Sequence, residues 1–346
     1  MPRVGILTGG GDCPGLNPAI RAVVRTAALY NYEVIGFLGG WRGALKNETR
    51  PITLDHIDDL QIKGGTILGT SRTNPYKEKD PVGSIKKSLA ANHLEALIAV
   101  GGEDTVGAGA KLFADGVPIV AIPKTIDNDL DATEFTLGFP TSVEIVCECI
   151  DRLKTTAESH DRVIVVEVMG RHAGWLTTYA GIAGGADAIA VPEFPMKLSE
   201  IIGAIEKARA RGKKYAIVAV AEGAKVVDDN GKELEKASAH AVDSFGHVQL
   251  GGVADLVRDA IQKKTGYDVK STILGYIQRG GSPSAFDRII STAFGVRAMQ
   301  LVKDKEYGKM PALVGGKIQV VKLSDATGKL KTLSPELYDL AKVFFG

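Results

Sequence analysis

Short apolar runs alternate with segments of helical periodicity along the first part of the chain. The apolar runs are typical of buried strands, and they lie at residues 3–7, 34–37, 94–100 and 117–122. The helical patterns lie between them, at residues 19–29, 87–91 and 106–113. Because strand and helix alternate, we expect a parallel sheet that is covered by helices on both faces.

A second block of the same alternation begins near Phe139, with a long amphipathic helix at residues 141–159. Further strands are predicted at residues 162–168, 186–191, 214–220 and 271–276. Further helices are predicted at residues 172–182, 198–211, 253–263 and 285–301, and a strand and a helix follow from about residue 317. No internal repeat or low-complexity linker interrupts the pattern, which therefore predicts two packed α/β domains.

The composition and net charge of the chain limit the kinds of molecule that it is expected to bind. The chain has 346 residues, of which 45% are hydrophobic and 24% charged, and a formal net charge of +1. This balance gives no reason to expect nucleic acid or an anionic membrane as a partner. Cys13, Cys147 and Cys149 lack the spacing of a zinc site, so we expect reduced thiols in a cytoplasmic protein. Residues 1–15 lack the layout of a signal peptide, and no apolar stretch approaches the roughly 18 residues of a membrane span.

Two acidic loops follow neighbouring predicted strands. Gly-Gly-Glu-Asp-Thr stands at residues 101–105 and Pro-Lys-Thr-Ile-Asp-Asn-Asp at residues 123–129. In open α/β sheets such strand ends form the ligand-binding crevice. Carboxylates there suit a divalent cation and a general base, whereas glycine and lysine suit phosphate. Together they indicate metal-assisted phosphoryl transfer, although Glu103 and Asp104 also fit a helix N-terminus and residues 127–129 also fit a turn.

A glycine-rich loop, Thr-Gly-Gly-Gly-Asp-Cys-Pro-Gly, occupies residues 8–15 after the first strand. Its glycines allow backbone N–H groups to approach phosphate oxygens near a helix N-terminus. It lacks the Gly-Lys-Ser/Thr of a Walker loop, and Pro14 breaks the dinucleotide pattern. A tight strand-to-helix turn is the alternative interpretation. Asn17 is the expected N-cap of the next helix, with Pro18 at its first position.

Arg171 and Arg279 each follow a predicted strand, and Glu222 follows another. An arginine can bind phosphate through paired N–H groups. A single arginine of this kind more often forms a surface ion pair. Two of them at strand ends, together with the acidic loops, indicate a phosphosugar site.

Seven ordered motifs resemble those of the 6-phosphofructokinases over nearly the whole chain. They lie at residues 8–17, 64–72, 101–105, 123–129, 169–171, 222–223 and 275–283. The resemblance implies two Rossmann-like three-layer α/β/α domains with mostly parallel sheets and an active site in the cleft between them. It implies a domain for the phosphoryl donor and Mg²⁺ at residues 1–138 and about 279–305. The fructose 6-phosphate domain is then expected at residues 139–278 and about 306–346.

The resemblance implies phosphoryl transfer to the 1-hydroxyl of fructose 6-phosphate, with Mg²⁺, to give fructose 1,6-bisphosphate. By position, Asp127 accepts the hydroxyl proton, Glu103 holds Mg²⁺, and Gly11 and Arg72 contact the phosphoryl donor. The sugar-phosphate site is assigned to Thr125, Ile126, Asp127, Asp129, Met169, Gly170, Arg171, Glu222, Tyr276 and Arg279. Arg162 and Lys270 match two basic residues that reach this site from a neighbouring subunit, which implies a homodimer or homotetramer.

The resemblance is most specific for the phosphoryl donor. ATP-using members carry glycine at the positions of Asp104 and Lys124, and this chain resembles the pyrophosphate-dependent members at both. Asp104 would place a carboxylate near the α-phosphate of ATP. Two like charges about 5 Å apart at an effective dielectric constant of about 20 repel by roughly 3 kcal/mol, or about a hundredfold in binding. Lys124 would offset charge on the leaving phosphate, so Lys124 and Asp104 join Asp127 and Arg171 in the expected catalytic set.

We therefore expect a reversible pyrophosphate-dependent enzyme of glycolysis and gluconeogenesis. One alternative is an ATP-dependent phosphofructokinase that tolerates Asp104 and Lys124, or a broader kinase that also accepts sedoheptulose 7-phosphate. A second is a sugar-phosphate-binding regulator without activity, which the intact carboxylates and arginines disfavour. A dinucleotide oxidoreductase is disfavoured by the broken glycine pattern. Residues from about 225 to 250 suggest no function.

Overall fold

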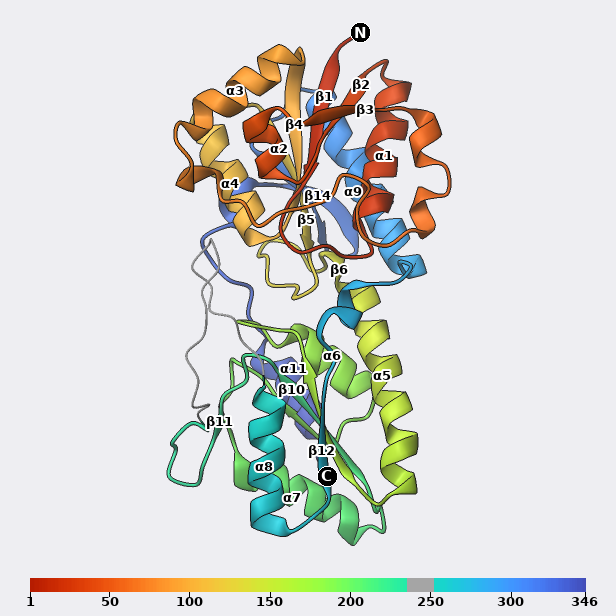
Figure 1. Cartoon of the computed structure of the whole chain (residues 1–346), viewed down its shortest axis with the longest axis vertical. Helices are drawn as coiled ribbons and strands as arrows, with labels where there is room; N and C mark the ends of the chain where they lie inside the picture. The colour runs from red at the N-terminus through yellow and green to blue at the C-terminus, as the bar shows by residue number, and fades with distance from the viewer. Residues whose placement is uncertain (235–251) are drawn as a thin grey trace. The chain divides into compact units, whose positions relative to one another are not determined.

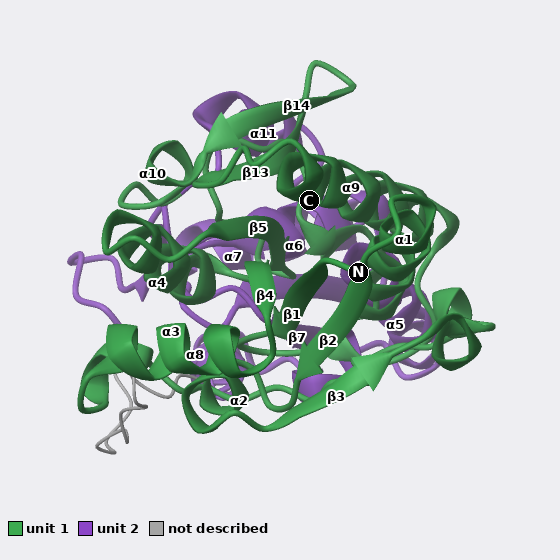
Figure 2. Cartoon of the chain, turned by 90° about the horizontal axis from the view of Figure 1, so that it is seen from above, with its two compact units in different colours: residues 1–141, 242–247, 279–330 green, residues 142–241, 248–278, 331–346 purple. Residues whose placement is uncertain are grey.

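The computed structural model describes residues 1–234 and 252–346 (Figure 1). The sequence suggests no function for the segment of about residues 225–250. Beyond Leu234 this segment lies outside the described residues. The described chain divides into two compact units, which Figure 2 shows in different colours. Unit 1 contains residues 1–141 and 279–330, and unit 2 contains residues 142–234, 252–278 and 331–346. Within these ranges, no helix has the length and apolar character needed to cross a membrane.

Unit 1 is built on a mostly parallel sheet. In the described part of the unit this sheet has eight strands, in the order β14-β13-β5-β4-β1-β2-β3 with β6 paired to β5. The strands are β1 (Arg3–Thr8), β2 (Glu33–Phe37), β3 (Thr49–Ile52), β4 (Leu94–Gly101), β5 (Ile119–Thr125), β6 (Leu137–Gly138), β13 (Lys309–Val314) and β14 (Lys317–Lys322). Strands β1, β4 and β5 lie in the middle and are almost wholly buried. Burial on both faces explains why their sequences are nearly continuous apolar runs.

Helices cover both faces of this sheet. They are α1 (Leu16–Leu29), α2 (Trp41–Lys46), α3 (Pro81–Ala91), α4 (Glu103–Ala114), α9 (Ala285–Lys303) and α10 (Leu323–Ala326). Helices α1 and α9 pack against each other on one face, and the other four contribute to a core on the opposite face (Figure 2). Trp41 and Val106 are fully buried in that core. Helix α5 (Phe139–Ser159) leads from unit 1 into unit 2.

Unit 2 has a smaller parallel sheet. Over the described residues, four strands form it in the order β12-β7-β10-β8. These are β7 (Val163–Val168), β8 (Ala188–Ala190), β10 (Ala216–Ala221) and β12 (Val269–Ile273), and a short separate pair is formed by β9 (Met196–Lys197) and β11 (Val226–Val227). The helices are α6 (Trp175–Ala183), α7 (Leu198–Ala210), α8 (Val253–Thr265) and α11 (Pro335–Lys342).

The helices of unit 2 lie on both faces of its sheet. Helices α7 and α8 pack over one face of β7, where Val163 and Val165 lie in a shared core with Ile201 and Val257. Side chains alternate between the faces along a strand. On β8 the neighbours of Ile189 face that core, whereas Ile189 itself lies against Gly181 of α6. Helix α6 therefore covers the opposite face, and the three-layer arrangement holds in this unit too.

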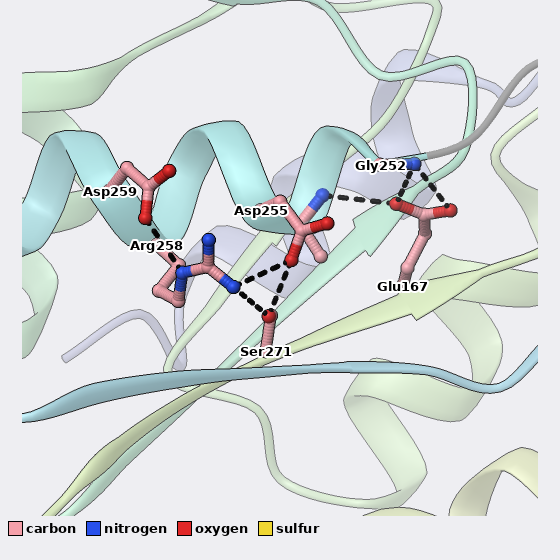
Figure 3. A network of polar contacts seen from close by, with 7 residues as sticks. Glu167, Gly252, Asp255, Arg258, Asp259 and Ser271 are labelled. Carbon is pink, nitrogen blue, oxygen red and sulfur yellow. Dashed lines mark hydrogen bonds and ion pairs between the residues drawn. The ribbon is translucent and has the colours of Figure 1, made fainter.

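A polar network fixes α8 to the sheet (Figure 3). The buried carboxylate of Glu167 in β7 accepts hydrogen bonds from the backbone N–H of Gly252 at 2.8 and 3.1 Å. Gly252 is the N-cap of α8, and the dipole of this helix stabilises a carboxylate at its N-terminus. One turn further on, Arg258 donates to Asp255 at 2.7 Å and to Ser271 of β12 at 2.8 Å. These contacts attach α8 to both β7 and β12.

The structure departs from the sequence-based expectation in two places. Residues 306–330, which we expected in the second domain, lie in unit 1 because β13 pairs with β5 and β14 extends the same sheet. The prediction that Asn17 caps the first helix is wrong, because α1 begins at Leu16 and Gly15 is its N-cap. The buried Asn17 side chain instead donates hydrogen bonds to the carbonyl groups of Lys63 and Gly64.

Candidate active site

Three loops of unit 1 leave its sheet at the same edge. Thr8 of β1 lies beside Val100 of β4, and Gly101 of β4 lies beside Pro123 of β5, in parallel register. Because the carboxyl ends of parallel strands meet at one edge, the loops that follow them are neighbours. These loops and the element ends beside them contain the sequence-predicted residues Gly11, Glu103, Asp104, Lys124, Thr125, Ile126, Asp127 and Asp129.

The glycine-rich loop is bound to the segment before Arg72. Gly10 donates its N–H to the carbonyl of Ser71 at 3.2 Å, and Thr70 Oγ1 donates to the carbonyl of Gly10 at 2.5 Å. Gly10 has a φ of +79°, a conformation that favours glycine over residues with a side chain. The exposed Arg72 directly follows Ser71 and therefore lies next to this loop.

Helix α4 begins with the two acidic residues that follow β4. Glu103 is exposed and Asp104 half-buried, and both lie in the first turn after the N-cap Gly102. The helix dipole stabilises negative charge in this position, so the structural role that the sequence left open is present. In this structural role the carboxylate of Glu103 stays exposed just after the end of β4, where it is accessible from solvent.

Lys124 is buried at the end of β5, with 3% of its surface exposed. Its Nζ donates a hydrogen bond to the carbonyl of Gly11 at 2.5 Å. Burial lowers the pKa of Lys124, and the guanidinium of Arg279 lowers it further, against the opposite effect of Asp12 and Asp127. A cation is thus held against the glycine-rich loop, shielded from water.

The loop that carries Asp127 is held by its own polar side chains. Asn128 has a left-handed φ of +52°, and its side chain accepts from the N–H of Thr136 at 3.1 Å and donates to the carbonyl of Glu134 at 3.0 Å. Thr136 Oγ1 in turn donates to the carbonyl of Thr125 at 2.6 Å, and the N–H of Asp127 donates to Thr125 Oγ1 at 3.2 Å. These bonds fix the backbone on both sides of the half-buried Asp127.

Arg279, expected in the sugar-phosphate site, lies against the glycine-rich loop. Its Nη1 donates to the carbonyl of Asp12 at 3.2 Å. A Cβ built on Gly11 would lie 2.5 Å from the same nitrogen, so a side chain at this position would displace the Arg279 guanidinium. Within unit 1 the guanidinium of Arg279 and the ammonium group of Lys124 therefore both contact the glycine-rich loop.

Unit 2 gathers a second set of predicted residues at the carboxyl edge of its sheet. Met169, Gly170 and Arg171 follow β7, Glu222 follows β10, and Tyr276 follows β12 in the 3₁₀ helix η4 (Gly275–Arg279). The N–H of Met169 donates to Gln278 Oε1 at 3.0 Å, and the N–H of Glu222 donates to the carbonyl of Val168 at 2.8 Å. Parallel pairing of β7 with β10 and β12 places these residues at one edge.

The N-terminus of α6, which follows Arg171, already has an anion. Both carboxylate oxygens of Glu193 accept from the N–H of Gly174, at 2.9 and 3.0 Å, and Oε1 also accepts from the N–H of Leu333 at 2.8 Å. This helix end is therefore neutralised from within the chain. At this edge, Arg171 is the side chain that the sequence predicts to bind phosphate.

Arg162 and Lys270 lie at the opposite edge of the same sheet. Arg162 precedes β7, and Lys270 is paired with Ile164 near the start of that strand. Both bind Asp268, from Arg162 Nε at 2.5 Å and from Lys270 Nζ at 2.8 Å. Arg162 stands six residues before Val168 at the end of β7, or about 20 Å of extended strand, and Lys270 is level with Ile164, about 13 Å before that end. Unit 2 does not bring these two cations to its own Met169–Arg171 edge.

Sequence reasoning missed the polar side chains that hold these segments in place. They are Thr70, Asn128, Thr136, Asp268 and Gln278. Asn128 and Gln278 stand inside matched motifs, and an asparagine between two aspartates is a signal for a left-handed residue. Thr136 and Asp268 carry no local signal, because their contacts depend on the folded sheet.

The comparisons with known proteins agree with this arrangement of two α/β units. The family model for phosphofructokinase matches residues 3–302, and the chain belongs to that family. It is 53% identical over 346 residues to a pyrophosphate–fructose 6-phosphate 1-phosphotransferase from Amycolatopsis methanolica, covering 99% of this chain and 100% of that protein. It is 44% identical over 347 residues to an ATP-dependent 6-phosphofructokinase from Corynebacterium efficiens, covering 99% of each.

Solved structures lead to the same family. Phosphofructokinase from Pichia pastoris, in its T-state, is similar with a TM-score of 0.83 and 30% identity, covering 94% of this chain and 35% of that chain. The expected family and the expected two-domain α/β fold are therefore confirmed.

Proposed function

We propose that the protein transfers a phosphoryl group reversibly between pyrophosphate and the 1-hydroxyl of fructose 6-phosphate. The observation that carries this proposal is the buried Lys124, bound to the carbonyl of Gly11 and accompanied by Asp104 on the neighbouring strand end. The relative at 53% identity has this activity in its name, whereas the ATP-dependent name belongs to a relative at 44%. A reversible reaction of this kind serves both glycolysis and gluconeogenesis.

Asp127 is the proposed general base. Asn128 and Thr136 fix its backbone, so its carboxylate can meet the 1-hydroxyl of the sugar in a constant geometry. The proton of the hydroxyl passes to this carboxylate while the oxygen attacks the terminal phosphorus of pyrophosphate. Lys124 and Arg171 are proposed to stabilise negative charge on the leaving phosphate and on the transferred group.

Glu103 is the proposed Mg²⁺ residue. Among the described residues, no group of three or more histidine, cysteine, aspartate or glutamate side chains could hold a metal ion. Proteins commonly bind Mg²⁺ through one or two carboxylates together with substrate phosphates. When bound with the phosphoryl donor, Mg²⁺ neutralises phosphate charge. Glu103, exposed at the end of β4, is the carboxylate that would hold it.

Donor choice follows from two charges that flank the glycine-rich loop. Asp104 lies in the first turn of α4, where its carboxylate repels a further phosphate such as the α-phosphate of ATP. Lys124 supplies one positive charge against the loop, which suits the compact charge of pyrophosphate. Gly11 and Arg72 complete the proposed donor site.

The sugar-phosphate site is proposed to need a second copy of the chain. Thr125, Ile126, Asp129, Met169, Gly170, Glu222, Tyr276 and Arg279 are its further proposed members. Arg162 and Lys270 lie near the end of β7 that is opposite to Arg171, and we propose that they reach the 6-phosphate bound by a neighbouring subunit. We therefore propose a homodimer or homotetramer with shared sites.

A cytoplasmic location goes with this proposal, and the cysteines are consistent with it. All three cysteines are free thiols. Burial raises the pKa of Cys13 to about 12, so this thiol is neutral and unreactive beside Lys124.

The experiment that tests the proposal compares pyrophosphate and ATP at equal concentration with fructose 6-phosphate and Mg²⁺. We expect initial rates with pyrophosphate only, and fructose 1,6-bisphosphate with inorganic phosphate should support the reverse reaction. Turnover with ATP only would contradict the donor assignment and keep the family. Binding of fructose 6-phosphate with no turnover on either donor would favour a regulator, and sedoheptulose 7-phosphate tests the acceptor range.

A further inference from the structure

Three consecutive carbonyl groups of the glycine-rich loop accept hydrogen bonds from side chains of distant segments. The donors come from the segment before Arg72, from the end of β5 and from the end of η4. They are Thr70 Oγ1 to Gly10 at 2.5 Å, Lys124 Nζ to Gly11 at 2.5 Å, and Arg279 Nη1 to Asp12 at 3.2 Å. All of these contacts lie within unit 1.

The direction of these carbonyls sets the direction of the next N–H groups. The described chain contains no cis peptide bond, so in each peptide unit of the loop the C=O and the N–H point to opposite sides. A carbonyl turned toward Thr70, Lys124 or Arg279 therefore turns the following N–H away from it. The three N–H groups concerned belong to Gly11, Asp12 and Cys13.

The N–H groups of the half-buried Gly11 and Asp12 are available to a ligand, whereas Cys13 is fully buried. In the described chain, none of the backbone hydrogen bonds outside regular helices and strands has the N–H of Gly11, Asp12 or Cys13 as donor. Successive backbone N–H groups in a loop of this kind form an anion-binding surface. The three carbonyl oxygens would repel an anion, but they point to the opposite side of the loop and accept hydrogen bonds there.

Thr70 differs from the other two side chains because it is uncharged. Its hydroxyl binds the carbonyl of Gly10, while the carbonyl of Ser71 accepts from the N–H of Gly10 at 3.2 Å. Gly10 is thus held on both sides, in its left-handed conformation, by two adjacent residues. The orientation of the first peptide unit in the loop depends on this contact.

We infer that Thr70 is a positioning residue for the phosphoryl donor, which turns the N–H of Gly11 toward pyrophosphate through the carbonyl of Gly10. This inference rests on the proposed function, since pyrophosphate is taken as the anion. Lys124 and Arg279 have the same effect on the next two peptide units, in addition to their charge. Thr70 itself does not need to touch the donor.

The test uses the full-length protein with Thr70→Val, which removes the hydroxyl at nearly the same volume, and Thr70→Ser, which keeps it. Thr49→Val is the matched control, because it also removes one partly buried hydroxyl bond in unit 1, from Thr49 to Asn92, away from the loop. We expect Thr70→Val to raise the KM for pyrophosphate about five- to tenfold, the effect of one lost hydrogen bond. The KM for fructose 6-phosphate should stay unchanged, the melting temperature should fall no further than in Thr49→Val, and Thr70→Ser should restore the wild-type KM.

Calorimetric titration with magnesium pyrophosphate alone provides a second readout that does not depend on turnover. We expect weaker binding to Thr70→Val than to wild type or Thr49→Val. An unchanged pyrophosphate KM in Thr70→Val, or an equal rise in both KM values with a lower melting temperature, would overturn the positioning role. A wild-type protein without pyrophosphate turnover would contradict the proposed function, and failure of that protein to bind magnesium pyrophosphate would also overturn the inference.

Discussion

Lys124 and Gly11 are 113 residues apart in sequence, yet Lys124 Nζ donates to the Gly11 carbonyl at 2.5 Å. A buried ammonium group is costly unless polar groups compensate for the lost water. The carbonyl supplies one such partner, and the carboxylates of Asp12 and Asp127 act in the same direction. The positive charge is thus fixed at the loop where the phosphoryl donor is proposed to bind.

Replacing both donor-selecting residues should change the preferred phosphoryl donor. In Asp104→Gly with Lys124→Gly, the repulsion of a further phosphate and the charge suited to pyrophosphate are both removed. We expect the ratio of kcat/KM for ATP to that for pyrophosphate to rise by about a hundredfold, the size of a roughly 3 kcal/mol charge effect. Initial rates with both donors at saturating fructose 6-phosphate measure this ratio.

Lys111→Ala is a suitable control for that experiment, because Lys111 lies on the same helix α4 near its C-terminal end. Its ratio should equal that of wild type. If the double variant kept both its pyrophosphate activity and its inability to use ATP, the two charges would have no part in donor choice.

The lowered pKa of Lys124 should appear in the pH dependence of donor use. Since the kcat/KM profile reports groups of the free enzyme, its alkaline limb for pyrophosphate should lie below the ordinary lysine value of 10.5. Lys124→Arg keeps its charge at such pH values, and this limb should disappear. A limb that is identical in wild type and Lys124→Arg would show that another group is responsible.

The titration of Lys124 also changes the free energy of unfolding, and the direction of this change follows from its lowered pKa. Because the folded-state pKa lies below 10.5, the unfolded chain binds more protons between the two values. The contribution of Lys124 to the free energy of unfolding therefore rises with pH across that window. Urea unfolding at several alkaline pH values should show this rise in wild type and a flatter profile in Lys124→Met.

The sequence predicts the fold and the strand-end residues well, for a local reason. A buried parallel strand is a continuous apolar run, so residues 94–100 and 117–122 mark β4 and β5 closely. Loops after such strands meet at one edge whatever their sequence. The pattern of apolar runs is therefore enough to predict that Glu103 and Asp127 lie at a common edge.

The contacts that position those residues could not be predicted, because they join distant segments. Asn17 has the sequence of a helix cap, but the fold places Lys63 and Gly64 beside it and its side chain binds them. Thr136 acts on Thr125 only because the loop folds back over β5. Propensity describes neighbours in sequence, whereas these bonds depend on tertiary packing.

Removal of the proposed base should separate binding from chemistry. Asp127→Asn keeps the size of the side chain and removes its ability to accept the hydroxyl proton. We expect kcat to fall by about 10²- to 10⁴-fold, the usual contribution of a general base. Isothermal titration with fructose 6-phosphate should give a dissociation constant close to that of wild type. A variant with near wild-type kcat would contradict the assignment, and Asp131→Asn in the same loop is the matched control.

Shared active sites predict that two inactive variants restore activity when they are mixed. Arg162 and Lys270 lie near the end of β7 that is opposite to Arg171, and each subunit is proposed to lend these cations to a neighbour. In a mixed dimer of Asp127→Ser and Arg162→Ala subunits, one of the two sites has an intact base and an intact partner arginine. Random exchange of equal amounts should therefore recover about a quarter of the wild-type sites.

The measurement is turnover after the two variants are dissociated, mixed and reassociated, with each variant treated alone as the reference. The double variant Asp127→Ser with Arg162→Ala, mixed with wild type, controls for exchange, because it can only dilute activity. If the mixture stayed as inactive as its parents although hybrids had formed, Arg162 would act within its own subunit.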